Sequence, residues 1–121
     1  QYHFRKVSCQ THIWDVNKLL IVTKNMIPLK ISLSRFEEQF NSLYWSKGKE
    51  LSCREISNHA KLINEADLSY PILVCPNYEI IDGMHRLCKA FILQKEYIDT
   101  YVLSILPQPD YVDVKPENLR Y

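Results

Sequence analysis

Charged and polar side chains gather in residues 82–86, which read Asp-Gly-Met-His-Arg and open a segment of helical periodicity. The first turn of a helix has unpaired N–H groups and a partial positive charge, which together favour a phosphate. His85 and Arg86 would oppose this dipole unless an anion lay between them, and Gly83 lets a ligand approach the backbone. The pattern therefore predicts a phosphate site. In a plainer interpretation Asp82 only caps the helix, Gly83 only makes a tight turn and the cations are solvated.

Three further groups of residues are candidates for the same site. His59 is expected on the preceding helix, as a second phosphate contact or as a locally packed residue. Trp45 with Lys47 and Lys49 would stack on a nucleobase and neutralise phosphate, or else Trp45 closes the edge of the core. Asp67 follows the same helix as His59 and would serve as a base, as a metal-bound carboxylate or as an ordinary loop residue.

Other polar residues have weaker claims to chemistry. Arg54 precedes His59 by five residues, and Lys89 lies one turn beyond His85, within expected reach of a phosphate. Glu37 and Glu38 on a short helix would supply a general base, although a helix cap with solvated charge explains them equally. Cys88 falls on an apolar stripe and is expected in the core rather than as a nucleophile.

The elements that must position these residues follow from apolar periodicity and from capping patterns. They are a helix over residues 15–24 capped by Asp15, a strand over 27–33, a short helix from a capping box at 34–37, a loop over 42–51, a helix from a capping box at 52–55 to about 64, strands over 70–75 and 78–81, a helix from 83, and a strand over 98–105. The inward faces are expected at Ile56, Ala60 and Ile63, and at Met84, Leu87, Cys88 and Phe91. We therefore expect an α/β (α+β) fold, with a small mixed sheet packed by helices. One domain would span residues 1–121, with its core over about 25–105 and an extended tail over 106–121.

Composition narrows the possible partners of the chain. Of its 121 residues 46% are hydrophobic and 24% charged, and the net charge of +1 makes DNA unsuited as the main partner. No run of 18 apolar residues is present, so no membrane span is expected. The four cysteines are scattered, which favours reduced thiols in the cytoplasm, and their spacing does not predict a metal site.

Part of the sequence resembles the ParB/sulfiredoxin superfamily. The resemblance rests on the apolar strand at 70–74, a short hairpin and the D-G-x-H-R motif at 82–86, followed by a helix and the strand at 98–102. It covers about residues 45–104, and the upstream stretch from His59 to Pro71 is similar to small, stand-alone ParB-like proteins. Sulfiredoxins carry a reactive cysteine where this chain has Met84, so sulfinic-acid reduction is not expected. ParB proteins that bind CTP carry a following DNA-binding domain, and from the length of this sequence we do not expect one here.

The resemblance implies a nucleotide or phosphate cradle at the helix start, and serine kinases of the superfamily match the motif best. The expected function is a nucleotide- or phosphate-binding domain, as an ATP- or ADP-dependent phosphotransferase or NTPase. ATP, ADP or CTP with Mg²⁺ would be the cofactor, and a nucleotide or a phosphorylated small molecule the partner. The alternative is a non-catalytic ParB-like module that binds DNA or protein. Catalytic roles are expected for Asp82, His85 and Asp67, and ligand binding for Gly83, Met84, His85, Arg86, His59, Arg54, Lys89 and Trp45.

Overall fold

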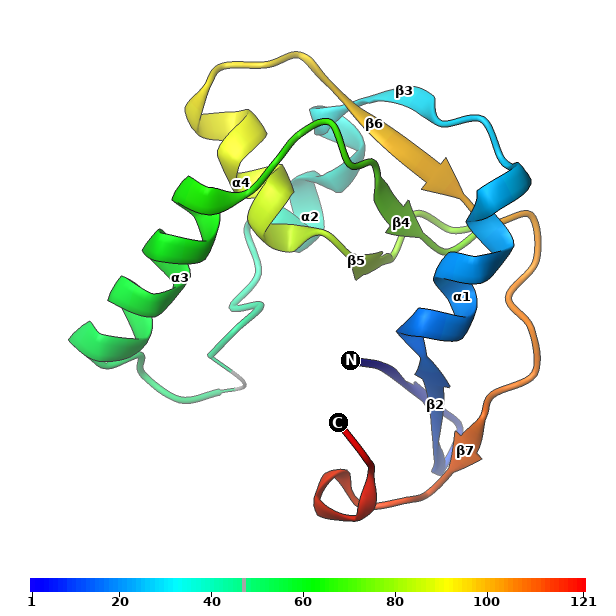
Figure 1. The fold of residues 1–121 in the computed structure, drawn as a ribbon. Coiled ribbons are helices and arrows are strands. Elements are labelled where there is room, and N and C mark those ends of the chain that lie inside the picture. The colour runs from blue at the N-terminus through cyan, green and yellow to red at the C-terminus, as the bar shows by residue number, and fades with distance from the viewer. Residues whose placement is uncertain (47) are drawn as a thin grey trace.

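The computed structural model describes residues 1–46 and 48–121 and confirms a small α+β fold (Figure 1). Its strands are β1 (Tyr2–Val7), β2 (Gln10–Asp15), β3 (Leu29–Ser32), β4 (Ile72–Val74), β5 (Ile80–Asp82), β6 (Tyr97–Val102) and β7 (Tyr111–Val112). Its α-helices are α1 (Val16–Val22), α2 (Glu37–Phe40), α3 (Cys53–Glu65) and α4 (Met84–Ile92), and 3₁₀ turns lie at Thr23–Asn25, Leu33–Phe36 and Pro116–Asn118.

The strands form two sheets. In the four-stranded sheet the order is β3-β6-β4-β5, with β4 and β6 parallel and the other neighbours antiparallel. The second sheet, β1-β2-β7, is antiparallel throughout. The sequence predicted neither the β1–β2 hairpin nor β7. The 106–121 tail is therefore more than an extended segment, because β7 pairs with β2 and the side chain of Leu119 is buried.

Side chains that alternate along β4 form two hydrophobic cores, one on each face of the larger sheet. Ile72 and Val74 pack with α4 and Phe36, whereas Leu73 and Cys75 pack with α1 and Trp14. Figure 1 shows α4 and α2 on one side of β4 and α1 on the other. The core therefore includes residues upstream of position 25. Both faces of β5, which leads into α4, are fixed by packing, since Ile80 lies in one core and Ile81 in the other.

Several expected element details are confirmed. Asp15 caps α1 by accepting a hydrogen bond from the Asn17 N–H. Ser52 and Glu55 form a complete capping box at the start of α3. The capping box expected from Ser34 is wrong, because the cap lies two residues earlier, at Ser32, and the turn begins at Leu33.

The expected inward face of α3 is wrong. Ile56 is 54% exposed and Ala60 is also exposed, while Ile63 is half-buried. The reason is the position of α3, which packs against α4 at the periphery of the domain rather than against a sheet (Figure 1). Phe91, expected on the buried stripe of α4, is also largely exposed near the end of that helix. Among the described residues, no helix has the length and apolarity that crossing a lipid bilayer requires.

Candidate functional site

The glycine at the start of α4 is required by packing. Gly83 has φ of +128°, and a Cβ at this position would lie 2.4 Å from Cγ2 of Ile72 in the core. The missing side chain therefore faces β4, which corrects the expectation that it makes room for a ligand. Met84 is likewise buried in the core, so only its backbone N–H is available to a ligand.

Asp82 and Arg86 form an ion pair with each other, so Asp82 does not cap the helix and Arg86 is not a solvated cation. The Arg86 guanidinium donates to Oδ2 of Asp82 at 3.1 Å and to the carbonyls of Tyr70 and Pro71 at 3.0 and 2.7 Å. Gly83 is the N-cap of α4, with no side chain accepting from its first turn. The interpretation of Asp82 as the cap is therefore wrong, and Arg86 joins α4 to the segment that enters β4.

Lys89 also has a structural partner. Its ammonium donates to the carbonyls of Asn64 and Ala66 at 2.8 and 2.6 Å, at the C-terminal end of α3. Cations are favourable at helix C-termini, so Lys89 fixes α3 against α4. This engagement replaces the phosphate contact that the sequence predicted for Lys89.

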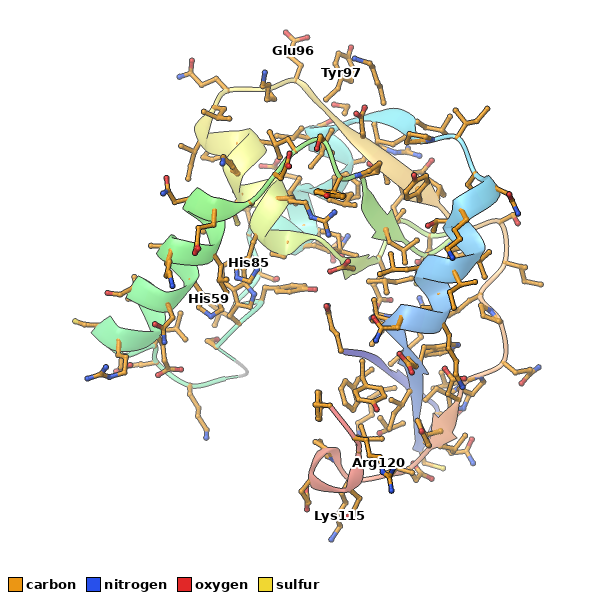
Figure 2. All side chains as sticks on the ribbon, viewed as in Figure 1. His59, His85, Glu96, Tyr97, Lys115 and Arg120 are labelled. Atoms are coloured by element: carbon orange, nitrogen blue, oxygen red, sulfur yellow. The ribbon has the colours of Figure 1, made fainter. Side chains whose placement is uncertain are left out.

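His59 and His85 lie side by side between α3 and α4 (Figure 2). Nδ1 of His59 and Nε2 of His85 are 2.9 Å apart, within hydrogen-bond distance, and the indole of Trp45 stacks on both rings at centroid distances of 4.1 and 4.6 Å. Burial, and to a lesser extent the neighbouring His59, lowers the pKa of His85, while Asp82 acts in the opposite direction. At neutral pH His85 is therefore uncharged, and the two imidazoles are linked by a single hydrogen bond.

A cavity of about 600 Å³ opens beside the start of α4. Four of the predicted site residues line it, namely Asp67, Asp82, His85 and Arg86. Its remaining wall is largely apolar and is formed by Leu20, Thr23, Leu62, Glu65, Ala66, Tyr70, Pro71 and Tyr101. The sequence did not single out these wall residues, since they come from four separate stretches of the chain and carry no motif.

Asp67 is an exposed carboxylate at the rim of this cavity. Oδ1 of Asp67 accepts a hydrogen bond from the N–H of Ser69 at 2.9 Å. Hydrogen bonding from Ser69 lowers the pKa of Asp67, so this group is a weak base that remains charged at neutral pH. Such a carboxylate suits a cation better than it suits proton abstraction.

A second cavity, of about 610 Å³, lies on the other flank of the histidine pair and is lined by Trp45 and His59. Tyr2, His3, Gln39, Tyr44 and Glu79 are among the other residues of its wall. Trp45 stacks on the two imidazoles, and that ring face is closed to a nucleobase.

The remaining candidates lie apart from both cavities. Arg54 is exposed in the first turn of α3, and Glu37 binds Asn41 on α2. Lys47 lies outside the described residues. Cys88 is half-buried against the core, as expected. Of the predicted residues, the structure thus brings together Asp67, Asp82, His85 and Arg86 around one cavity, with His59 and Trp45 behind His85.

Comparison with known proteins leaves the chain without a matched relative. No protein-family model matches the sequence, and no curated protein or solved structure gives a significant match.

Proposed function

We propose that this domain binds a phosphate-bearing ligand of the nucleotide class at the start of α4, in the cavity lined by His85 and Asp67. The observation that carries the proposal is the combination of an uncapped helix start with that cavity. The first-turn N–H groups of a helix bind oxyanions most readily where no side chain already accepts from them. The resemblance of residues 82–86 to ParB/sulfiredoxin-like domains supports the same assignment.

The charge on the site is adjustable. His85 is neutral in the free protein because burial and His59 lower its pKa. A bound oxyanion adds negative charge beside the imidazole and so favours its protonated form. His59 would accept the added proton from His85, or share it, through the hydrogen bond that already joins the two rings. Binding of a phosphate is therefore expected to take up a proton near neutral pH.

Size and chemistry favour a nucleotide over free phosphate. A cavity of about 600 Å³ lies within the range of small-molecule sites. Tyr70 and Tyr101 offer aromatic surface for a base on its wall. Asp67 would hold Mg²⁺ on the phosphates, and phosphoryl transfer or hydrolysis then depends mainly on positioning and charge neutralisation. We also propose a cytoplasmic location, as the scattered cysteines suggest.

Titration of purified protein with ATP, ADP and CTP, with and without Mg²⁺, tests the binding. We expect saturable binding by the wild type and about tenfold weaker binding by His85→Gln. His12→Gln alters a half-buried histidine on β2 and should bind as the wild type does. If no nucleotide and no inorganic phosphate binds, the proposal fails.

Turnover distinguishes an enzyme from a binding module. Release of phosphate from ATP in the presence of Mg²⁺, reduced in Asp67→Asn with nucleotide affinity retained, would support phosphoryl transfer. Nucleotide binding without turnover would leave a non-catalytic module. Salt-dependent binding of duplex DNA, in the absence of nucleotide binding, would favour the DNA-binding alternative.

A further inference from the structure

Three side chains with metal-ligating atoms converge beneath the second cavity. His3 lies on β1, Cys75 follows β4, and Glu79 precedes β5. Nε2 of His3, Sγ of Cys75 and a carboxylate oxygen of Glu79 all lie within 4.8 Å of one another. His3 and Cys75 are buried, with exposed fractions of 8% and 0%, while the Glu79 side chain is 35% exposed. The cluster is separate from the phosphate site proposed at α4.

A tight turn brings two of these residues together. The N–H of Cys75 donates to the carbonyl of Glu79 at 2.8 Å, and the N–H of Tyr78 donates back to the carbonyl of Cys75 at the same distance. Tyr78 adopts φ of +68°, and the Asn77 side chain accepts from the N–H of Glu79. The turn holds the thiol and the carboxylate side by side, and β1 places His3 against them.

The separations suit a tetrahedral ion. Zinc bonds of about 2.0 Å to nitrogen or oxygen and about 2.3 Å to sulfur place neighbouring ligand atoms roughly 3.3–3.8 Å apart. Nε2 of His3 is 3.3 Å from Oε1 of Glu79 and 4.0 Å from Sγ of Cys75. The three atoms lie within 4.8 Å of one another, so side-chain adjustments would have to bring Cys75 closer to the other two to place all three on one ion. An imidazole, a thiolate and a carboxylate together favour zinc over Mg²⁺ or Ca²⁺.

The surroundings support such an ion. The Arg5 guanidinium donates to Oε2 of Glu79 at 2.7 and 3.1 Å, which leaves Oε1 directed at His3. An outer partner of this kind orients a ligating carboxylate. Zinc binding displaces the proton of the Cys75 thiol, because the thiolate is the form that ligates a metal. Thiolate and carboxylate then offset the two charges of the ion.

We infer that His3, Cys75 and Glu79 form a zinc site whose fourth position faces the second cavity. His3 and Glu79 line this cavity of about 610 Å³, which gives an entry route and room for a water or another fourth ligand. Three protein ligands with one open position is the arrangement of zinc sites that bind an exchangeable ligand. Such a site lies on the same cavity as Trp45 and His59.

Metal titration of the chelator-treated 121-residue chain tests the inference. We expect one Zn²⁺ per chain, and one Co²⁺ that shows a sulfur-to-cobalt charge-transfer band in the near ultraviolet. Cys75→Ser should abolish the band, and His3→Gln and Glu79→Gln should each weaken Zn²⁺ binding at least tenfold. Matched controls are Cys88→Ser, which removes a half-buried thiol outside the cluster, and His12→Gln, which removes a histidine from the neighbouring strand. Both controls should bind as the wild type does.

Thermal unfolding of each variant without metal reports whether it folds. If Cys75→Ser does not fold, the charge-transfer band of the wild type and its weakening in Glu79→Gln decide the question. The inference is overturned if Co²⁺ binds without that band, if no metal binds at micromolar concentration, or if the three ligand variants bind Zn²⁺ as tightly as the controls do.

Discussion

The start of α4 and the cluster of His3, Cys75 and Glu79 hold their polar groups in opposite ways. On α4 the side chains of Arg86 and Lys89 are already hydrogen-bonded, since each donates to backbone carbonyls of a neighbouring segment. In the cluster the ligating atoms converge on one interior point instead. A run of charges in sequence thus does not by itself identify ligand contacts, because the backbone is an abundant competing acceptor.

The largest effect is expected for the residue that fixes the α4 start. Gly83→Ala forces a methyl group to within 2.4 Å of Ile72 Cγ2 and holds alanine at φ of +128°. We expect a loss of at least about 3 kcal/mol in the free energy of unfolding, from overpacking and backbone strain together. Chemical denaturation measures it.

Gly48→Ala is the matched control for this change. Gly48 also has positive φ, +82°, yet an added Cβ would meet no atom within 4 Å. Only the backbone strain remains, and we expect a cost of about 1 kcal/mol. Equal costs at the two glycines would show that packing against Ile72 does not fix the start of α4, and would reopen the space there for a ligand.

A smaller loss is expected for Arg86→Ala. The change leaves the carbonyls of Tyr70 and Pro71 and the carboxylate of Asp82 without their shared donor. We expect destabilisation of about 2 kcal/mol by chemical denaturation, because the Arg86 and Asp82 side chains are only 17% and 22% exposed. Arg54→Ala, at an exposed position on α3, should change stability by less than about 0.5 kcal/mol.

The outcome for Arg86 separates structure from ligand binding. If Arg86→Ala keeps the stability of the wild type but loses nucleotide affinity, then Arg86 is a ligand contact whose bonds to backbone contribute little. A stability loss, with nucleotide affinity retained in the folded fraction, would confine Arg86 to positioning α4.

Local sequence patterns predicted much of the fold and the α4 site. The capping residues Asp15 and Ser52 and the strand-to-helix junction at Gly83 could be predicted because each depends on neighbours within four residues. Side-chain partners could not be predicted in the same way. Arg86 and Lys89 bind carbonyls 15 to 25 residues away, and no periodicity encodes which acceptor a long side chain reaches.

The cluster at His3 was hidden for the same reason at a longer range. His3 and Cys75 are 72 residues apart and meet only because β1 packs beside the turn that follows β4. Pairs such as Cys75 and Glu79, four residues apart across a turn, resemble no standard ligand spacing in the sequence. The position of α3 was also missed, since an amphipathic pattern does not say how much of a helix face its partner covers.

The smallest expected effect is on the pH dependence of stability, and it compares His85 at the α4 site with His3 in the cluster. Burial is the main cause that lowers the pKa of both His85 and His3, and Glu79 opposes the shift at His3. Each imidazole therefore takes up a proton less readily in the folded chain than in the unfolded chain. Their stabilising contribution is complete above about pH 6.5 and is lost as the pH falls toward the lowered pKa values.

We expect the free energy of unfolding of the metal-free protein to decrease between pH 7.5 and 5, with a shallower slope in His85→Gln and in His3→Gln. Denaturant titrations across this range measure the slope. Zinc sharpens the contrast, because a metal-bound imidazole cannot accept a proton at its ligating nitrogen. Saturating Zn²⁺ should therefore steepen the slope of the wild type and of His85→Gln but not that of His3→Gln. An equal response in all three would place the metal elsewhere.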